Sequence, residues 1–470
     1  MNHTHDLIVI GAGAAGLTAA AGCAMYGLKV ALIERGRMGG ECLNTGCVPS
    51  KALLAAAHRA HAVRTAARLG IVTAEPRIDF AAVHAHVQAA IARIAPHDAR
   101  ERFEGMGVDV IAGAACFVSP NRVRVGERTL SAPRIVIATG SRPRLPDIPG
   151  LAQTPHLTNE TIFDLTECPD HLLILGGGAI GVEMAQAFRR LGAAVTVVEA
   201  DRLLAHEDAD AAALLLDKLR AEGVRILAGT AARRIAATEA GIEVALADGQ
   251  TIAASHLLVA TGRTPDLASL DLAAAGVIVG KDGIVIDAHL RTSARHILAI
   301  GDCRAGPRLT HVAGHEGTLA VRAIALGLPA RADWSAMPRA IYTQPELAQI
   351  GLTEADARAK HGEVAVVTAS FADNDRALAE NDAVGFVKLV RARGRVVGVT
   401  IIGAHAGELL VPWTQILARR ASIFALAGAV VAYPTRSEAS KAAAFASAQP
   451  MLFHPLLKRW AALLVWARRA

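Results

Sequence analysis

The sequence predicts an α/β fold with two Rossmann-like dinucleotide-binding modules and a separate α+β C-terminal domain. The first observation is DLIVIGAGAAG at residues 6–16, an apolar strand that ends in a glycine turn and leads into an alanine-rich helix. The second is HLLILGGGAIG at residues 171–181, which repeats that pattern. In both copies an acidic residue, Glu34 or Glu199, follows the first glycine by 23 positions. A repeated strand, glycine turn, helix, strand and acid at matched spacing is a strong signal for two nucleotide sites.

Length and composition set the outer limits of the interpretation. A chain of 470 residues with 52% hydrophobic and 20% charged residues should contain several domains with large cores. The net charge of +6 is small, and no basic cluster with interleaved aromatic residues precedes the extreme C-terminus, so nucleic-acid binding is not expected. The chain begins almost directly on a strand and has no apolar run of about 20 residues, so we expect a cytoplasmic location.

The glycine turn of the first module should bind a pyrophosphate. Gly11, Gly13 and Gly16 let the backbone approach the phosphates at a helix N-terminus, where the helix dipole favours an anion. Glu34, at the end of the strand KVALIE, is placed to accept hydrogen bonds from ribose hydroxyls.

The stretch GGECLNTGCVPSK, Gly39–Lys51, places two cysteines close after this turn. Cys42 and Cys47 are separated by four residues, so they can close a short disulfide within reach of the bound dinucleotide. Cys23, Cys116, Cys168 and Cys303 are scattered singly, and we interpret them as small buried residues. The combination predicts electron transfer between a bound cofactor and a cysteine pair.

The second module and the connecting strands follow the same plan. Its glycine turn contains Gly176, Gly178 and Gly181. Each module has a later strand that ends in Ala-Thr-Gly, at residues 138–140 and 260–262, and we expect both turns to close against a cofactor. The strand HILAIGDC then ends at Gly301-Asp302 and should return the chain to the first cofactor. From about Trp334 onward, GFVKLVRARGRVVGVTIIG predicts an antiparallel hairpin in a separate domain.

These motifs, with a C-terminal YPTRSE, resemble those of the pyridine nucleotide–disulfide oxidoreductases from Leu7 to about Phe445. The resemblance includes dihydrolipoamide dehydrogenase and the catalytic core of mercuric reductase. It implies FAD in the first module, NAD(P)H in the second, and a homodimer formed by the C-terminal domain. The expected domains are 1–149 and 266–334 for FAD, 150–265 for NAD(P)H, 335–449 for dimerisation and 450–470 for a tail.

The resemblance also implies residue roles. Cys47 would lie against the flavin, Cys42 would exchange with substrate, and Lys51 would pair with Glu183 beside flavin N5. The positions expected to contact FAD are Gly11, Gly13, Ala14, Gly16, Glu34, Gly40, Lys51, Ala114, Thr139, Gly140, Asp302 and Ala313. The positions expected to contact NAD(P)H are Gly176, Gly178, Ala179, Ile180, Gly181, Glu199 and Gly262. No resident metal site is expected.

The second module favours NADH over NADPH. Glu199 can accept both ribose hydroxyls and would repel the 2′-phosphate of NADPH. Arg202 lies three residues further on and leaves the alternative open, because an arginine there could accommodate that phosphate.

The chain departs from the thiol-reducing members at Tyr433. Those members have HPTxxE, whose histidine reaches the partner subunit's active site and transfers protons, whereas this chain has Tyr433 with Glu438. Tyrosine has an ordinary pKa near ~10, so it is a poor base at neutral pH. Mercuric reductases share the tyrosine but have a C-terminal cysteine pair, and here no cysteine follows Cys303.

Three acceptor interpretations therefore stay open. The cysteine pair reduces a small-molecule acceptor, which is a disulfide or a thiol-bound metal. Alternatively, the chain is an NADH:quinone or metal reductase that does not use its cysteines. A third interpretation is a slow redox sensor or thiol metal-binding protein.

The C-terminal run LLKRWAALLVWARRA has an amphipathic pattern. A helical stripe contains Leu456, Trp460, Leu463, Leu464 and Ala467, and the basic residues Lys458, Arg459, Arg468 and Arg469 lie largely elsewhere. This tail either packs against the body or the partner subunit, or makes peripheral contact with an anionic membrane.

Overall fold

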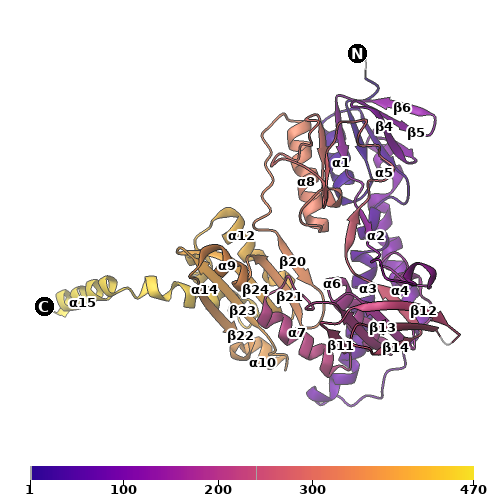
Figure 1. The fold of residues 1–470 in the computed structure, drawn as a ribbon. Coiled ribbons are helices and arrows are strands. Elements are labelled where there is room, and N and C mark those ends of the chain that lie inside the picture. The colour runs from indigo at the N-terminus through magenta and orange to yellow at the C-terminus, as the bar shows by residue number, and fades with distance from the viewer. Residues whose placement is uncertain (1–2, 240, 470) are drawn as a thin grey trace. The chain divides into compact units, whose positions relative to one another are not determined.

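A computed structural model describes residues 3–239 and 241–469 (Figure 1). The chain forms two compact units. The first comprises the residues up to Val63, then Glu75–Leu203 and Glu222–Trp334. The second comprises Arg64–Ala74, Leu204–Ala221 and the residues from Ser335 onward.

The first unit is built on a five-stranded parallel sheet in the order β19-β7-β1-β2-β3. Its strands are β1 Leu7–Ile10, β2 Val30–Glu34, β3 Asp109–Ala112, β7 Arg134–Ile137 and β19 Ile297–Ala299. They are short apolar runs because both faces are covered. Helices α1 (Ala14–Met25) and α8 (Thr310–Ile324) cover one face and approach each other closely at Gly317, where an added Cβ would meet Thr18.

The cysteine segment folds as two helices after β2. The short α2 (Gly40–Asn44) contains Cys42, and α3 (Cys47–Thr65) begins at Cys47. Helices α4 (Phe80–Ile94) and α5 (Arg100–Gly105) follow, and an antiparallel sheet of β4 (Ala115–Ser119), β5 (Arg122–Val125) and β6 (Arg128–Ser131) lies between β3 and β7 in the chain.

The second module of this unit has a parallel sheet in the order β11-β10-β9-β15. The strands are β9 His171–Leu175, β10 Ala194–Glu199, β11 Arg225–Ala228 and β15 His256–Val259, and helix α6 (Ala179–Leu191) follows β9. An antiparallel sheet of β12 (Ala232–Thr238), β13 (Gly241–Leu246) and β14 (Thr251–Ala254) is inserted before β15. After the two Ala-Thr-Gly turns, the short strands β8 (Ser141–Pro143) and β16 (Arg263–Pro265) pair with each other, and β17 (Val279–Gly280) pairs with β18 (Gly283–Ile284).

The second unit contains an antiparallel sheet in the order β20-β21-β24-β23-β22. Its strands are β20 Pro338–Ile341, β21 Glu346–Gly351, β22 Ala365–Ser370, β23 Phe386–Ala392 and β24 Arg395–Gly403. Its helices are α7 Ala209–Ala221, α9 Glu354–His361, α10 Asp375–Ala379, α11 Ala406–Leu409, α12 Val411–Arg419, α13 Ile423–Ala427, α14 Ser437–Leu452 and α15 Pro455–Arg469. The predicted hairpin is confirmed as β23–β24, and so is the fold class of two α/β modules with an α+β domain.

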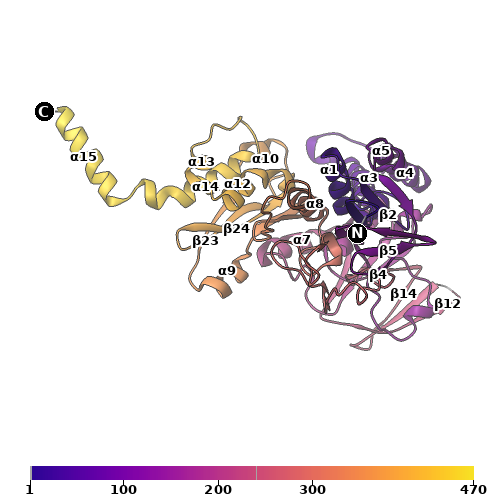
Figure 2. The same cartoon turned by 90° about the horizontal axis from the view of Figure 1, so that it is seen from above.

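The tail forms α15, which follows α14 in both views (Figures 1 and 2). Every described residue of α15 is exposed, including Leu463 and Trp466. Within residues 3–239 and 241–469, no helix combines the length and the apolar character that crossing a bilayer requires.

Candidate functional site

The two glycine loops have the same geometry. Gly11 adopts φ +106°, and a Cβ there would overlap the carbonyl of Ala138 in the first Ala-Thr-Gly turn. Gly176 adopts φ +112° and meets Ala260 in the second turn in the same way. Each loop therefore packs directly on its own turn, which only glycine permits at this distance.

The two strand-end acids also occupy equivalent positions. Glu34 accepts hydrogen bonds from the backbone N–H groups of Ala12 and Gly36, both at 2.7 Å. Glu199 accepts from Gly177 at 2.7 Å and from Asp201 at 3.1 Å. Each carboxylate is therefore held beside its own glycine loop, where a ribose would lie.

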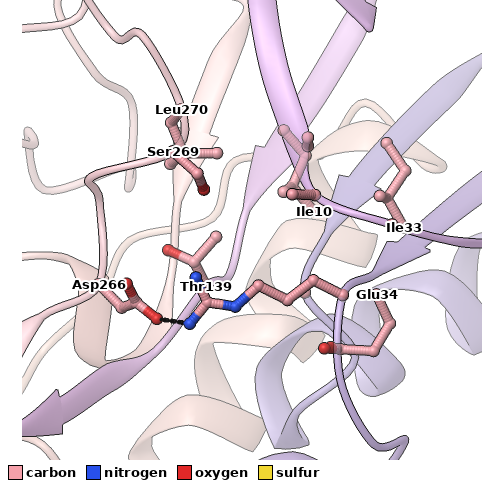
Figure 3. Close-up of a pocket in the computed structure, with 12 residues that line it drawn as sticks. Ile10, Ile33, Glu34, Thr139, Asp266, Ser269 and Leu270 are labelled. Atoms are coloured by element: carbon pink, nitrogen blue, oxygen red, sulfur yellow. Dashed lines mark hydrogen bonds and ion pairs between the residues drawn. The ribbon is translucent and has the colours of Figure 1, made fainter. Parts of the chain in front are cut away.

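A cavity lies beside the first loop (Figure 3). Gly11, Glu34, Ala114 and Thr139 are among its lining residues. The Thr139 hydroxyl is buried there without a hydrogen-bond partner, which is costly unless a ligand supplies one. Arg35 forms an ion pair with Asp266 at this cavity.

Cys42 and Cys47 are both reduced in this structure and interact with each other. A hydrogen bond from Cys42, together with one from Thr310, lowers the pKa of Cys47 to about 6, although burial opposes this. The same hydrogen bond and burial raise the pKa of Cys42. The Thr310 hydroxyl, at the first residue of α8, lies 3.2 Å from Cys47 Sγ. The hydrogen bond therefore favours the thiolate at Cys47 and the proton on Cys42.

Lys51 and Glu183 form an ion pair between helix α3 and helix α6 of the second module. Lys51 Nζ in α3 lies 2.8 Å from Glu183 Oε2 in α6. The Glu183 side chain is only 6% exposed, so it requires this cation as a partner. The positive charge of Lys51 also helps to lower the pKa of the neighbouring Cys47.

A second charged network surrounds Glu41, the residue before Cys42. The Glu41 carboxylate pairs with Arg263 and accepts a hydrogen bond from Asn159 Nδ2 at 3.0 Å. Burial raises the pKa of Glu41 to about 7, although Arg263 opposes this. Arg263 Nε also donates to Ser141 Oγ at 2.8 Å, and that hydroxyl donates to Asp302 Oδ2 at 2.8 Å.

The sequence did not identify Thr310, Arg263 or Glu41 as site residues. A signal existed for Arg263, because Thr-Gly-Arg in the second module matches Thr-Gly-Ser, ending at Ser141, in the first. Thr310 had no comparable signal.

The other expected cofactor positions lie at loops and helix starts. Gly40 approaches Gly13 so closely that a Cβ on Gly40 would meet the Gly13 Cα at 2.7 Å. Ala14 begins α1 and Ala179 begins α6. Gly16 and Gly181 each pack against the first glycine of their loop. Gly140 and Gly262 have positive φ, Gly178 is the N-cap of α6, Ile180 is its second residue, and Ala313 is buried in α8.

Tyr433 and Glu438 lie in the second unit. The Tyr433 side chain is 72% exposed, and its hydroxyl donates to Asp375 Oδ2 at 3.0 Å. This hydrogen bond raises the pKa of Tyr433. Glu438, in the first turn of α14, accepts from the backbone N–H of Thr435 at 3.3 Å.

The fold and the site together define an oxidoreductase with two nucleotide-binding modules and a cysteine pair. Residues 5–317 match the model of the pyridine nucleotide-disulphide oxidoreductases, and residues 337–444 match the dimerisation domain of the same family. The chain belongs to the pyridine nucleotide-disulphide oxidoreductase family. It is an FAD-dependent enzyme of this class, uses NAD(P)H, and forms a homodimer through the dimerisation domain.

Among its relatives is a mercuric reductase of Streptomyces lividans, 36% identical over 455 residues, which cover 94% of this chain and 96% of that protein. A dihydrolipoyl dehydrogenase of Geobacillus stearothermophilus is 34% identical over 451 residues, which cover 93% of this chain and 95% of that one. Among solved structures, the Cu(II) complex of the HOCl-induced flavoprotein disulfide reductase RclA from Escherichia coli matches with a TM-score of 0.83. It is 30% identical, and the match covers 92% of this chain and 98% of that one.

Proposed function

We propose that the enzyme passes electrons from NADH to the Cys42–Cys47 pair and then to a disulfide or a thiol-bound metal ion. The observation that carries this proposal is the surroundings of the pair, in which Thr310 Oγ1 lies 3.2 Å from Cys47 Sγ and a hydrogen bond from Cys42 lowers the pKa of Cys47. FAD, when bound, supplies the acceptor for the nicotinamide hydride and delivers two electrons to the cysteines. Lys51 provides a positive charge next to the pair, and Glu183 fixes its position.

Cys42 is the thiol proposed to react with a disulfide acceptor. Its thiolate attacks one sulfur, forms a mixed disulfide and releases the first thiolate. The Cys47 thiolate then attacks the Cys42 sulfur, which restores the Cys42–Cys47 disulfide and releases the second thiolate. Cys42 must first lose its proton, and its raised pKa makes that loss difficult without a base.

Tyr433 does not supply this base effectively. Its hydroxyl already donates to Asp375, and the raised pKa keeps it protonated at neutral pH. Disulfide acceptors, which need a base to remove the Cys42 proton, should therefore react slowly. A soft metal ion carried by small thiols does not need that base, because metal binding to a thiolate itself releases the proton. The similarity to a mercuric reductase supports the metal as the preferred acceptor.

The proposed reductant is NADH rather than NADPH. Glu199 lies beside the second glycine loop and holds a negative charge where the 2′-phosphate of NADPH would lie.

An acceptor panel tests this function. Steady-state NADH oxidation would be measured with lipoamide, glutathione disulfide, thiol-bound Hg²⁺ and quinones, for the wild type and for Cys42→Ser and Cys47→Ser. We expect the thiol-bound metal to be reduced fastest and both serine variants to lose that activity. Quinone reduction retained in both variants would favour the quinone reductase instead. Uniformly slow turnover would favour a sensor.

Restoring the histidine provides a second arm of the same test. Tyr433→His should raise lipoamide or glutathione disulfide turnover by at least about tenfold, since general acid–base help is typically larger still. Anaerobic reduction of the internal disulfide by NADH should hardly change, because that step releases no substrate thiolate. A variant no faster on any disulfide would contradict the role proposed for this position.

We also propose that α15 makes peripheral contact with an anionic membrane at the cytoplasmic face. The helix exposes Leu456, Trp460, Leu463 and Leu464, and residues 455–469 contain four basic and no acidic residues. The match to the dimerisation domain ends at residue 444, so the recognised dimer domain does not include this helix.

Truncation after Phe453 tests the membrane contact. We expect the shortened chain to keep its flavin and its dimer but to lose co-sedimentation with phosphatidylserine vesicles. Binding by the full chain should weaken with salt, since each basic residue contributes about 1 kcal/mol near an anionic surface. Loss of the dimer on truncation would support packing against the partner subunit instead.

A further inference from the structure

Arg263 is the centre of a hydrogen-bond network that joins three segments distant in the chain. Its side chain is 13% exposed and begins β16, directly after the second Ala-Thr-Gly turn. Besides its ion pair with Glu41, it donates to Ser141 Oγ at 2.8 Å, to the Ser141 carbonyl at 2.9 Å and to Asn159 Oδ1 at 3.1 Å. Four acceptors for one guanidinium leave it little freedom to move.

Two of these partners hold the short helix α2. Glu41 lies in α2 directly before Cys42. Asn159, which is only 7% exposed, donates to Glu41 and also to the carbonyl of Thr45, the C-cap of α2, at 3.3 Å. A helix of five residues has too few internal hydrogen bonds to hold its own position, so outside contacts such as these contribute to where Cys42 lies.

The network also reaches Asp302. Ser141 Oγ accepts from Arg263 and donates to Asp302 Oδ2. Helix α2, the β8–β16 pair and the carboxylate after β19 are therefore connected by four successive side chains: Glu41, Arg263, Ser141 and Asp302.

We propose that Arg263 and Glu41 are positioning residues, which hold α2 so that Cys42 and Cys47 can close their disulfide. This inference rests on the proposed redox role of Cys42 and Cys47. A disulfide forms only within narrow limits of distance and dihedral angle, so a loosened α2 should favour the dithiol. Arg263 thus stabilises the oxidised state through geometry.

Arg263→Met separates positioning from a simple effect of charge. Loss of a nearby cation disfavours the Cys47 thiolate and should shift the equilibrium toward the disulfide. Loss of positioning should shift it toward the dithiol. The two mechanisms therefore predict opposite signs. We expect about a tenfold shift toward the dithiol, which corresponds to about 30 mV for this two-electron couple.

The measurement uses the FAD-containing dimer equilibrated in glutathione redox buffers, followed by acid quenching, alkylation and mass spectrometry of the Cys42 and Cys47 peptides. Arg144→Met is the matched control, because Arg144 Nη2 donates to the Thr261 carbonyl beside the same β8–β16 pair rather than to a residue of α2. Arg263→Lys should recover part of the shift. In Arg263→Met with Glu41→Gln, the combined shift should be smaller than the sum of the single shifts.

A shift toward the disulfide, or no shift, in Arg263→Met would overturn the inference. If that variant does not fold, Asn159→Ala provides the same test from the other side of α2, with the same expected sign. If the wild-type protein forms no Cys42–Cys47 disulfide at any glutathione redox potential, the proposed role of the pair would be overturned instead.

Discussion

Removing the Thr310 hydroxyl should change the acidity of Cys47 by a predictable amount. That hydroxyl lies 3.2 Å from Cys47 Sγ and lowers its pKa, which is about 6. A hydrogen bond to a charged group contributes roughly 1.5–3 kcal/mol, and one pKa unit corresponds to about 1.4 kcal/mol. Thr310→Val, which has nearly the same shape, should therefore raise the pKa of Cys47 by about 1–2 units.

The assay follows the long-wavelength thiolate–flavin absorbance of the NADH-reduced enzyme as a function of pH. Because the thiolate is the absorbing form, the band is present above the pKa of Cys47 and disappears as the pH falls through it. We expect the midpoint near 6 in the wild type and about 1–2 units higher in Thr310→Val. Thr310→Ser keeps the hydroxyl and should behave like the wild type. A midpoint unchanged in the valine variant, or a band retained in Cys47→Ala, would refute the reasoning.

Three further predictions concern charged side chains. Lys51→Met removes the cation that pairs with the buried Glu183 carboxylate and should slow anaerobic reduction of the enzyme by NADH about 10²-fold in stopped-flow measurements. A rate within about threefold of the wild type would contradict the role of the pair. Wild-type enzyme should be reduced faster by NADH than by NADPH, and Glu199→Ala should lower the ratio of the NADH rate to the NADPH rate by at least about tenfold. An unchanged ratio would indicate that Arg202 rather than Glu199 determines the nucleotide preference. Lys388→Met removes the cation that pairs with Asp208, which is 2% exposed, and should lower the free energy of unfolding by about 3–5 kcal/mol in denaturant titrations. A change below about 1 kcal/mol would show that the pair is dispensable for stability.

The sequence predicted the parts of the fold whose constraints are local. A glycine turn between an apolar strand and a helix is encoded within about a dozen residues, and Gly11 and Gly176 have nearly identical surroundings in the structure. The hairpin β23–β24 is likewise encoded by adjacent residues. By contrast, the antiparallel sheet β12–β14 inserted in the second module was not predicted, because its short strands carry no motif.

The contacts that tune the site could not be predicted because they join residues far apart in the chain. Thr310 lies 263 positions from Cys47, and Arg263 lies 222 positions from Glu41. Neither pair follows from periodicity or spacing, since only the packing of α8 and the β8–β16 pairing bring the partners together. The pairing of Lys51 with Glu183 follows from the family resemblance rather than from a physical argument on the sequence.

We expect the replacement of the family histidine by Tyr433 to have its main consequence at Cys42. The hydrogen bond within the cysteine pair keeps one proton on Cys42 and the negative charge on Cys47. That arrangement suits electron transfer to the pair, but it leaves Cys42, the sulfur proposed to react with substrate, in its less reactive form. In the thiol-reducing members, a histidine across the dimer interface would remove that proton. Here the tyrosine hydroxyl donates to Asp375, so we expect it not to act as that base, and we expect turnover to depend on an acceptor that itself displaces the Cys42 proton. A soft metal ion does this, because thiolate binding releases protons, and a simple disulfide does not.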